Sequence, residues 1–435
     1  MKCIRCSTDN TLKDRTDNQG RCKNCQHPFA FEPTAMGTVK ITDPMFAKAI
    51  ADLSANNTLF FTSKQLLYFF DKRFKSKGAI PTFGWFFLYL IVATIATATV
   101  GNLLFSETKS VLALFTPAIV LSLITGFTLF SMGKSAKSSP RVRQNSAKSL
   151  QAVGGLILIV GILAGIAGNS FLLFALSVLL GIGLVYLGFR QRQRQTLIHQ
   201  EFVIDSTQFQ GWLDRWQQVN ASASNLLPPS RENNAPATVN PDVTAYSFDR
   251  LVVCSSAAIA QLLIANNFHF ENNCAILSIT GYPQSIFDTT MAMLRRNAEL
   301  KVYAFHDCTA RGVGLMYQLR TSPKWFQSSA VEIFDVGLLP RQIFPSKTMF
   351  IQSAADAVQA AKQMPADVRS SLSKEELTWL EAGNYVELES FTPKQLIHIL
   401  NHGIAGSREV GSDDSSLIFV DTYAGNSYYV VESFG

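Results

Sequence analysis

Long runs without charge dominate the middle of the chain. Asp, Glu, Lys and Arg are absent from residues 82–105, 111–132 and 151–189. A helix needs about 20 apolar residues to cross a bilayer core, and the last run is long enough for two helices joined at Gly168-Asn169-Ser170. A buried helical core of a soluble protein is the alternative, but such helices rarely stay uncharged on every face. The pattern therefore predicts four transmembrane helices within 82–189, the third one short, at roughly 82–105, 110–132, 151–167 and 170–189.

Basic residues flank this block in three clusters. The cluster before the first predicted span consists of Lys72, Arg73, Lys75 and Lys77. The cluster between the second and third spans consists of Lys134, Lys137, Arg141, Arg143 and Lys148, and the cluster after the fourth consists of Arg190, Arg192 and Arg194. The other two connections hold only Glu107 with Lys109, and no charge. Short cationic loops stay on the cytoplasmic side, so we expect an integral membrane protein with both termini in the cytoplasm. Met1–Asn10 is polar, so no cleavable signal peptide is expected there.

The same clusters explain most of the net charge. The chain has 435 residues and a formal charge of +6, with 38 basic and 32 acidic residues. Twelve of the basic residues and only one acidic residue, Asp71, lie in or beside the clusters, so the remaining sequence is mildly acidic. We therefore interpret the positive charge as facing lipid. It gives little support to a nucleic-acid partner, which stays an open alternative.

Four of the seven cysteines stand near the N-terminus. Cys3-x-x-Cys6 and Cys22-x-x-Cys25 are separated by 15 residues, which is the spacing of two turns that bring four thiolates to one tetrahedral zinc ion. With Gly20 before the second pair and Phe29 after it, residues 1–35 resemble a zinc ribbon. We expect a structural zinc ion that supplies the folding energy of this short segment. Disulfides are not expected with cytoplasmic termini.

Residues 41–77 show helical patterns on both sides of a short break. Asp43-Pro44 suits the first turn of one helix, and Thr62 or Ser63 starts a second one. The intervening Thr58-Leu59-Phe60-Phe61 leaves two interpretations open. One interpretation is a small winged-helix-like unit. The other, which we favour, is a helical adaptor between the ribbon and the membrane block.

The segment after the fourth span predicts a juxtamembrane helix over 190–219. One side of this helix is aromatic and consists of Phe202, Phe209, Trp212 and Trp216. This side would lie on the membrane surface or brace the next domain. Residues 220–241 are rich in Asn, Pro, Ser and Ala, which is typical of a linker.

Residues 242–435 alternate strand-like and helical runs. The predicted strands are Leu251–Val253, Ala275–Thr280, Lys301–Phe305 and Val331–Asp335, and the helices between them are Ser256–Ala265, Ser285–Asn297 and Gly312–Leu319. Such alternation indicates a parallel sheet covered by helices on both faces, with any site at the carboxyl ends of the strands. A polar loop at 407–416 and a hairpin formed by 417–420 and 427–431 would close the chain. The predicted fold class is a multi-domain membrane protein with a zinc ribbon, a four-helix transmembrane block and a C-terminal α/β domain.

Four short motifs of this domain resemble a known family. They are Leu251–Ala257 (LVVCSSA), Ile279–Pro283 (ITGYP), Val302–Gly312 (VYAFHDCTARG) and Gly337–Pro340 (GLLP). Together they look like the toprim domain of the A subunit of type IIB topoisomerases, over roughly 245–345 with a possible extension through Tyr385–Leu400. The resemblance implies a toprim-like fold in which a Glu after the first strand and an Asp-x-Asp after a later strand hold magnesium.

The sequence departs from this pattern at the metal ligands. Cys254 stands at the position of the Glu, Asp307 matches the first Asp, and Thr309 replaces the second; Ala310 replaces the following proline, and Gly312 is kept. One carboxylate and a thiol do not make a magnesium site. The resemblance therefore implies the fold but not the magnesium chemistry, so magnesium is not expected as a cofactor.

Other chemistry at these positions stays open. Asp307, Cys254 and His306 are the catalytic candidates, because Cys and His, with Cys308 nearby, could form a nucleophilic pair or a metal site. In the alternative, the thiols are small buried side chains and Asp307 caps the following turn. His398 and His402 stand four residues apart without an acidic neighbour.

Two functions compete at this point. The first is a membrane-anchored, non-catalytic scaffold or regulatory protein that binds an unidentified cytoplasmic protein. The second is a membrane-tethered, metal-dependent nuclease or other phosphotransfer enzyme, which requires Asp307 to recruit Asp335, Glu387 or Glu389; we expect the last two to share one strand face at an exposed edge. A transporter ranks last, because the spans contain no ionisable residue to mark a pathway.

Overall fold

The structure of the chain is a computed structural model. It describes residues 1–37, 39–77, 82–108, 110–136, 138, 140–193, 199–220, 225–229, 248–297, 299–327, 329–346, 349–406, 418–421 and 429–432. The chain divides into two compact units. One comprises Met1–Asp71 with Ile204–Gly435, and the other comprises Lys72–Val203. Each unit has its own apolar core.

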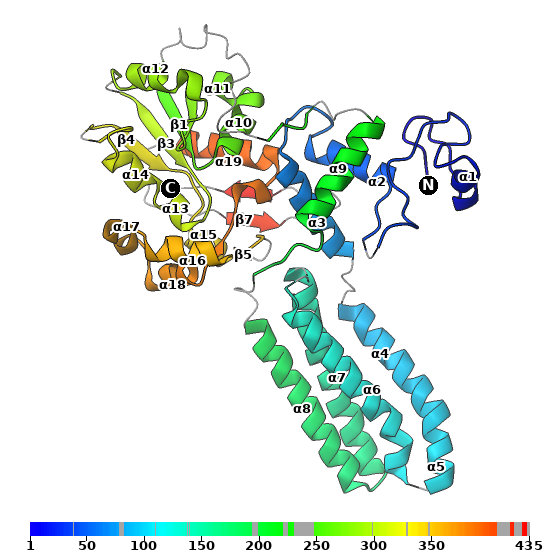
Figure 1. Cartoon of the computed structure of the whole chain (residues 1–435). Coiled ribbons are helices and arrows are strands. Elements are labelled where there is room, and N and C mark those ends of the chain that lie inside the picture. Colours follow the sequence, from blue (N-terminus) through cyan, green and yellow to red (C-terminus); the bar gives the residue numbers. More distant parts are fainter. Residues whose placement is uncertain are drawn as a thin grey trace. The chain divides into compact units, whose positions relative to one another are not determined.

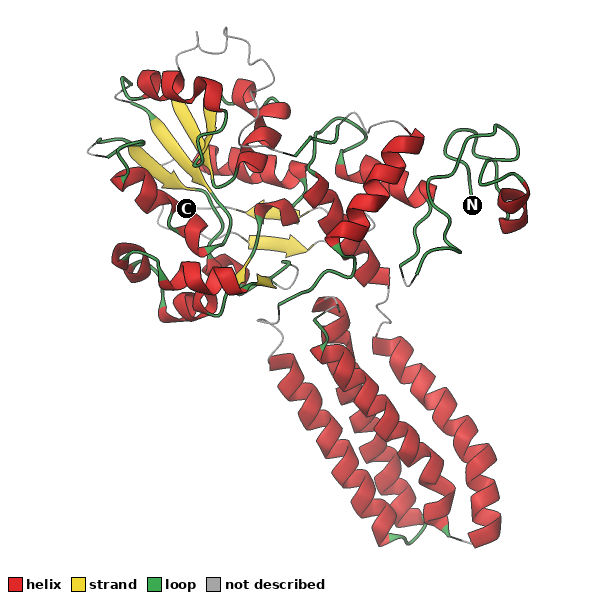
Figure 2. Ribbon diagram, viewed as in Figure 1, coloured by secondary structure: helices red, strands yellow, loops and turns green. Residues whose placement is uncertain are grey.

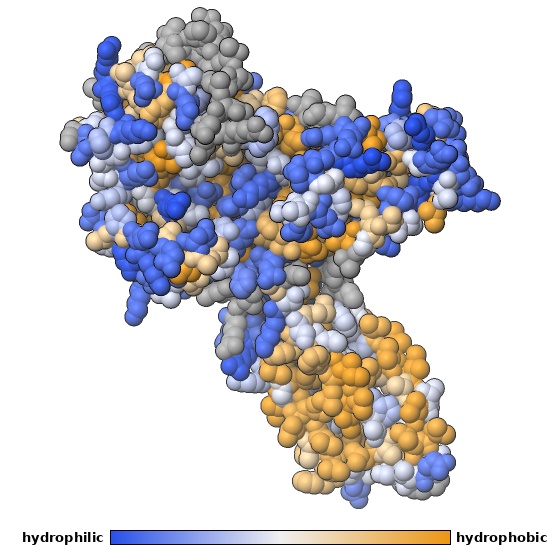
Figure 3. Space-filling view, viewed as in Figure 1, coloured by the Kyte–Doolittle hydropathy of each residue, from blue (hydrophilic) through white to orange (hydrophobic). Residues whose placement is uncertain are grey.

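The Lys72–Val203 unit is built from long apolar helices (Figure 1). The first runs through α4 (Thr82–Ala96), the π-helical turn η1 (Thr97–Gly101) and α5 (Asn102–Thr108), and the others are α6 (Val111–Lys134), α7 (Pro140–Ala167) and α8 (Phe171–Gln193). Four segments are long and apolar enough to cross a membrane: Gly84–Thr108, Leu112–Lys134, Val142–Ala167 and Phe171–Gln193. Figure 3 shows the outer surface of this helical block as largely hydrophobic. The prediction of four such helices is confirmed.

The third helix differs from its predicted length. It was expected to be short, starting at 151, but α7 begins at Pro140 and has 28 residues. Proline suits the first turn of a helix, and the Arg143 guanidinium donates from Nε to the carbonyl oxygen of Ser138 at 3.0 Å. The basic cluster therefore continues into the helix instead of forming a loop. The predicted start was wrong because it placed the first residue of the helix after the last charged residue, Lys148.

Small residues let α7 and α8 pack closely. A Cβ atom added at Gly161 would lie 2.2 Å from Ser177 Cβ, and one added at Gly188 would lie 2.9 Å from the carbonyl oxygen of Ala147. Such close approach is typical of helix pairs in lipid. The two helices form an antiparallel hairpin through Asn169, whose φ is 50°, as the sequence predicted.

A four-stranded parallel sheet forms the centre of the α/β domain (Figure 2). Its strands are β1 (Arg250–Cys254), β2 (Cys274–Ser278), β3 (Lys301–Phe305) and β4 (Glu332–Asp335), in the order β2-β1-β3-β4. Alternate residues of each strand enter two different cores: Val252 and Tyr303 lie in one, and Val253 and Ala304 in the other. The prediction of a parallel sheet between two apolar layers is confirmed.

Helices cover both faces of this sheet. α10 (Ala257–Ala265) and α19 (Pro393–Gly406) contribute to one core, whereas α12 (Gln284–Leu294) and α14 (Leu315–Thr321) contribute to the other. The helix predicted over 312–319 is instead two pieces, α13 (Ala310–Val313) and α14. Shorter elements complete the domain: α11 (Phe268–Glu271), α15 (Pro340–Ile343), α16 (Ala355–Lys362), α17 (Ala366–Ser370), α18 (Lys374–Glu381), η4 (Leu388–Ser390), and the antiparallel pair β5 (Gln352–Ser353) and β6 (Asn384–Tyr385).

The same unit contains the N-terminal ribbon and three further helices. These are α1 (Leu12–Asp17) in the ribbon, α2 (Asp43–Leu53), α3 (Ser63–Lys77) and α9 (Ser206–Asn220). The ring of Trp216 on α9 lies 4.8 Å from that of Phe46 on α2 and 6.1 Å from that of Phe31. The aromatic side of α9 therefore braces the adaptor. α2 and α3 confirm the two helices predicted within 41–77.

Two connections differ from the sequence prediction. The single helix expected over 190–219 is interrupted, because α8 ends at Gln193, residues 199–205 are not helical, and the Asp205 carboxylate accepts a hydrogen bond from Thr207 N at 3.0 Å where α9 begins. Within the predicted linker 220–241, Leu226 forms a bridge with Phe61 and Leu227 is buried. Residues 221–224 and 230–241 lie outside the described residues.

The chain ends in an antiparallel pair, β7 (Ile418–Asp421) and β8 (Tyr429–Glu432). This agrees with the predicted terminal hairpin. Its turn and the polar loop predicted at 407–416 lie outside the described residues.

Candidate zinc site and strand-end cluster

The four N-terminal cysteines lie together in the ribbon. The Sγ atoms of Cys3, Cys6, Cys22 and Cys25 all lie within 4.8 Å of one another. In the part of the chain that the structure describes, they are the only group of three or more His, Cys, Asp or Glu residues at such spacing. Cys3 and Cys22 are buried, and the other two are half-buried. Four soft sulfur donors around one point fit the tetrahedral geometry of a structural zinc site.

Each Cys-x-x-Cys pair forms the same turn. The residues that follow the pairs, Ser7 and Gln26, have φ angles of 58° and 57°. Ser7 N donates to the carbonyl oxygen of Cys3 at 2.9 Å, and Gln26 N donates to that of Cys22 at 3.0 Å. The two turns are therefore geometric copies, and each contributes two sulfurs to one point.

The surroundings of the thiols shift the pKa values of Cys6 and Cys25 in opposite directions. Cys3 Sγ lies 3.6 Å from Cys25 Sγ, and Cys6 Sγ lies 3.5 Å from Cys22 Sγ. The hydroxyl and backbone of Thr8 lower the pKa of Cys6 to about 6. The His27 backbone opposes the change at Cys25, but desolvation and the neighbouring thiols raise its pKa to about 12. A divalent cation is the species that would let all four thiols ionise together.

Buried polar residues hold the second turn in place. Asn10 is fully buried; its Nδ2 lies 3.5 Å from Cys22 Sγ, and its Oδ1 accepts a hydrogen bond from Lys23 N at 2.9 Å. Arg15 reaches the carbonyl oxygen of Asn10 at 2.9 Å and pairs with both oxygens of Glu32, at 2.8 and 3.0 Å. Such outer contacts orient metal ligands.

The ribbon is joined to the adaptor by Asp43. This buried carboxylate accepts hydrogen bonds from Ala30 N at 2.9 Å and Phe31 N at 3.0 Å. Asp43, the first residue of α2, therefore also fixes the end of the ribbon through Ala30 and Phe31. Burial raises the pKa of Asp43, although the two N–H donors oppose the change.

The second candidate region lies at the carboxyl ends of β1 and β3. Cys254 ends β1 and pairs in register with Phe305, the last residue of β3. Its thiol is fully buried, and desolvation raises its pKa well above the ordinary value; the same holds for Cys308. A thiol in this state is not an activated nucleophile. Cys254 thus packs as a small apolar side chain in the core of the sheet.

Asp307 follows β3 and is held by the protein itself. Its Oδ2 accepts a hydrogen bond from Ser255 Oγ at 2.9 Å, and its Oδ1 accepts one from Leu388 N at 2.5 Å. Desolvation raises the pKa of Asp307, and these two donors counteract that effect. The carboxylate therefore ties the end of β1 to the first residue of η4 (Leu388–Ser390). Thr309, rather than Asp307, caps α13 by accepting from Gly312 N at 2.9 Å.

His306 is fully buried and pairs with Asp335, whose side chain is 24% exposed. Its Nε2 lies 3.0 Å from Asp335 Oδ1, and its Nδ1 lies 2.9 Å from the carbonyl oxygen of Asp307. Both neighbours are acceptors, so a proton on each ring nitrogen satisfies both. Desolvation alone would lower the pKa of His306, but Asp335 raises it above the ordinary value. Desolvation would likewise raise the pKa of Asp335, but the imidazolium of His306 and the Gly337 N–H lower it. The structure does not bring His306 and Cys254 together as a hydrogen-bonded pair.

A cluster that the sequence did not reveal covers this end of the sheet. Lys64 Nζ on α3 lies 2.7 Å from Glu387 Oε1 and 3.7 Å from Glu389 Oε2. Tyr68 donates its hydroxyl to Glu387 Oε2 at 2.6 Å, and Thr62 donates to Glu389 Oε1 at 3.1 Å. Desolvation opposes the change, but the charges of Glu387, Glu389 and Asp307 raise the pKa of Lys64. The Lys64 ammonium group thus provides the positive charge near Glu387, Glu389 and Asp307.

The expected strand face for Glu387 and Glu389 is wrong. β6 ends at Tyr385 and residues 388–390 form the 3-10 helix η4, so the two glutamates flank the start of that helix. Both are mostly buried, with side-chain exposures of 20% and 16%. Burial raises the pKa of Glu389, and Lys64 opposes the change. They are interior anchors for α3 and not exposed rim residues.

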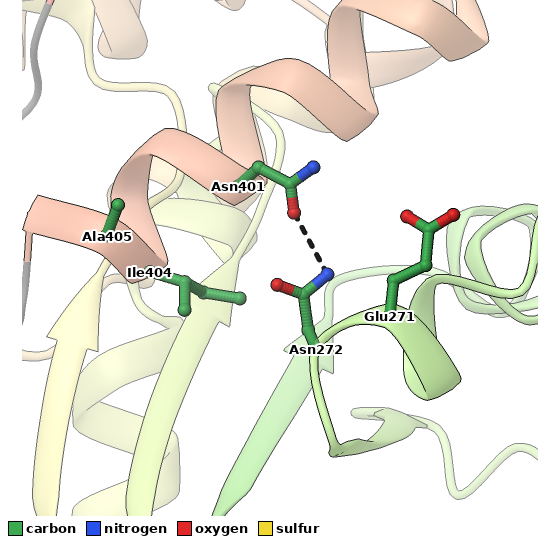
Figure 4. Close-up of a pocket in the computed structure, with 5 residues that line it drawn as sticks. All are labelled: Glu271, Asn272, Asn401, Ile404 and Ala405. Atoms are coloured by element: carbon green, nitrogen blue, oxygen red, sulfur yellow. Dashed lines mark hydrogen bonds between the residues drawn. The ribbon is translucent and has the colours of Figure 1, made fainter.

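A cavity of about 320 Å³ opens elsewhere on the α/β domain, where β2 begins. Its lining is polar and comes from the end of α11 and from α19: Glu271, Asn272, Asn401, Ile404 and Ala405 (Figure 4). Asn272 Nδ2 donates to Asn401 Oδ1 at 2.9 Å and so joins the two elements. None of the candidate residues predicted from the sequence lines it.

No family model, no curated protein and no solved structure matches the chain. The resemblance to the toprim domain therefore stays a prediction. What the structure adds is the parallel sheet, with Cys254 and Asp307 at the carboxyl ends of neighbouring strands. Together, these features describe a membrane-associated protein with an N-terminal cysteine cluster, four apolar helices and a C-terminal parallel α/β region.

Proposed function

We propose that the protein is a polytopic, membrane-anchored scaffold without catalytic activity. Its zinc ribbon, adaptor and degenerate toprim-like domain form one cytoplasmic body that binds a protein partner. Four transmembrane helices hold this body at the membrane, and both termini lie in the cytoplasm.

The observation that carries this proposal is the state of the carboxylates at the strand ends. Asp307 is held by Ser255 and Leu388, Asp335 by His306, and Glu387 by Lys64 and Tyr68. A magnesium site needs several oxygen donors that are free to turn toward one ion. Here the protein supplies its own donors and its own cation, which supports a structural role for the cluster.

The ribbon contributes to the same body. A zinc ion on the four cysteines would fix the two turns, and Asp43 carries that order to α2 through Ala30 and Phe31. Since a closed four-sulfur site has no position for water, zinc there would serve folding and not hydrolysis.

A divalent-cation titration of the full-length protein in detergent tests the absence of metal chemistry. We expect Mg²⁺ or Mn²⁺ to leave the Tm unchanged relative to an equal ionic strength of NaCl. A rise in Tm that Asp307→Asn abolishes would contradict the proposal. The asparagine keeps the acceptor for Leu388 N, so the variant tests the charge with little change in packing.

A second candidate is the metal-dependent nuclease. It is favoured by one observation, that the charges of Glu387, Glu389 and Asp307 all raise the pKa of Lys64 against its desolvation. If the lysine merely excludes a metal, Lys64→Ala should acquire Mn²⁺ binding, measured by the paramagnetic resonance of bound manganese. The scaffold proposal predicts no such gain, because Tyr68, Thr62 and Leu388 still hold the carboxylates.

The partner itself can be sought by crosslinking the intact protein in its native membrane before purification. We expect a crosslinked protein in stoichiometric yield, and its loss in a Cys22→Ser variant that still inserts. Recovery of nucleic acid alone would favour the nuclease. The excess of acidic over basic residues in 242–435, 20 against 14, argues against strong attraction to phosphate backbones.

A further inference from the structure

One end of the four-helix unit gathers cations. Gly133 near the end of α6 lies under the side chain of Gln191 near the end of α8, so close that an added Cβ would overlap the amide. Gly188 on α8 lies against Ala147 near the start of α7. These contacts bring the end of α6, the first part of α7 and the end of α8 to one level of the unit.

Four exposed cations stand next to these contacts, and we call them the collar: Lys134, Lys148, Arg190 and Arg192. Gln191 Nε2 donates to the carbonyl oxygen of Phe130 at 3.0 Å, which ties the last turn of α8 to the last turn of α6. The collar therefore joins three helices and is not a charged run on one of them.

Within the described residues, the collar has no carboxylate as a counter-charge, because none of its members forms an ion pair with one. The sequence explains why, because residues 72–203 contain only two acidic residues, Glu107 and Glu201. Glu107 lies in α5, at the opposite end of the first span from the basic cluster that precedes α4.

Apolar and aromatic groups place the collar at a bilayer surface. Tyr186 and Phe189 are 60% and 55% exposed in the turn that precedes Arg190, and Phe127 is 72% exposed two turns before Lys134. Lys134 Nζ lies 4.3 Å from the centre of the Phe130 ring, so its stem follows the apolar helix while its charge stays at the end. An exposed tyrosine ring next to cations is typical of the headgroup level.

We infer that the collar binds the phosphate groups of anionic phospholipids in the leaflet that it faces. This inference rests on the proposed membrane anchor. Anionic lipid is the occupant that the geometry favours, because the cations surround the end of an apolar surface that acyl chains would cover. Each Lys or Arg near such a surface contributes about a fivefold preference for the charged lipid.

The experiment uses the full-length protein in liposomes of phosphatidylcholine with a minor fraction of spin-labelled phosphatidylglycerol or spin-labelled phosphatidylcholine. We expect phosphatidylglycerol to be enriched at the protein over phosphatidylcholine, and the enrichment to fall as NaCl rises. In K134Q/K148Q/R190Q/R192Q it should fall at least tenfold. The control R296Q/R311Q/R320Q/K362Q removes the same charge from exposed positions of the α/β domain and should keep the enrichment.

Three outcomes would overturn the inference. Equal association of the two lipids, or equal losses in the two quadruple variants, would show that the collar does not select lipid. The preference for phosphatidylglycerol could also be lost in inorganic phosphate while NaCl at the same ionic strength leaves it unchanged. That result would assign the collar to free phosphate. Failure of the protein to resist carbonate extraction from the liposomes would refute the membrane anchor as well, whereas insertion without preference would refute the collar alone.

Discussion

Lys64 Nζ lies 2.7 Å from Glu387 Oε1, although the two residues are 323 positions apart. Lys64 is on α3, the helix that ends at Lys77, five residues before α4 begins. Glu387 is in the α/β domain beside Asp307, which contacts the following residue, Leu388. The Lys64–Glu387 ion pair therefore links α3, the helix that precedes the first span, to the carboxyl ends of the strands. Those strand ends hold Asp307, the candidate metal ligand.

We predict that Lys64→Met lowers the free energy of unfolding by about 1–2 kcal/mol. The lysine side chain is 42% exposed, so solvent screens part of its attraction, but its loss leaves two mostly buried glutamates with one cation fewer. Tyr68→Phe should cost about 1 kcal/mol through the lost hydrogen bond. Thermal unfolding of the full-length protein in detergent measures both.

Lys48→Met is the matched control for this prediction. Lys48 pairs with Asp52 at 3.2 Å on α2, but the two side chains are 64% and 38% exposed. Its replacement should change the stability by less than about 0.5 kcal/mol. Equal effects at Lys64 and Lys48 would mean that the Lys64 cluster is an ordinary surface pair.

The His306–Asp335 pair predicts a pH dependence. The folded pKa of His306 lies above its ordinary value of 6.5, so its contribution to stability is fully present below about pH 6.5 and is lost as the pH rises through the raised pKa. Asp335 behaves oppositely: its lowered pKa gives stability above its ordinary value of 3.8 that is lost in stronger acid. The Tm of the wild-type protein should therefore decline on the alkaline side of pH 6.5.

His306→Gln isolates this effect from the other titrating groups. The difference in Tm between the wild type and the variant should be largest near pH 5–6 and should shrink as the pH rises. His269 serves as a control, because burial lowers its pKa and its titration acts in the opposite direction. A difference that does not vary with pH would show that His306 is neutral in the folded protein.

Metal analysis tests the ribbon directly. We expect about one zinc ion per chain, lost together with the order of the ribbon on Cys22→Ser. Asn10→Ala should weaken zinc retention against a chelator by about 10–100-fold, because Asn10 holds both Cys22 and Lys23 N. Asn24→Ala is the control, since its side chain is exposed and bonds only Thr8 Oγ1. Retention of zinc by the Cys22 variant would refute the four-sulfur site.

Local pattern predicted the elements well where their periodicity was unambiguous. The strand over Lys301–Phe305 has the bounds that the sequence indicated, and the spacing of the four cysteines was enough to expect their approach. The start of α7 was missed because charge was taken as the end of a helix, whereas Arg143 is satisfied by nearby backbone carbonyls.

The contacts of the strand-end cluster could not be predicted in the same way. The sequence around Lys64 does not indicate an ion-pair partner more than 300 residues later in the chain. From the sequence, Glu387 looks like one half of an exposed Glu-x-Glu pair. The one local signal was the placement of two glutamates among apolar residues. Long-range pairing of this kind depends on the packing of α3, which a single sequence does not encode locally.

Gly312 and Gly337 give the last prediction, because both are needed for close approach around Asp307 and His306. A Cβ at Gly312 would lie 2.2 Å from the carbonyl oxygen of Asp307, and one at Gly337 would lie 2.3 Å from His306 Cδ2. The contact at Gly312 is with backbone, which cannot yield as a flexible side chain can, and the contact at Gly337 is with the buried ring of His306. Gly312→Ala should therefore lower the free energy of unfolding by about 2–3 kcal/mol and Gly337→Ala by about 1–3 kcal/mol. Chemical denaturation in detergent measures both.

Gly211 on α9 provides the opposite control. No atom lies within 4 Å of a Cβ added there, so Gly211→Ala should stabilise the helix by about 0.5–1 kcal/mol. The displaced Asp307 carbonyl in Gly312→Ala is also the acceptor for His306 Nδ1. That variant should therefore lose part of the pH dependence as well as stability. Unchanged stability in Gly312→Ala would mean that the strand-end loop is not packed against α13 as closely as the structure has it.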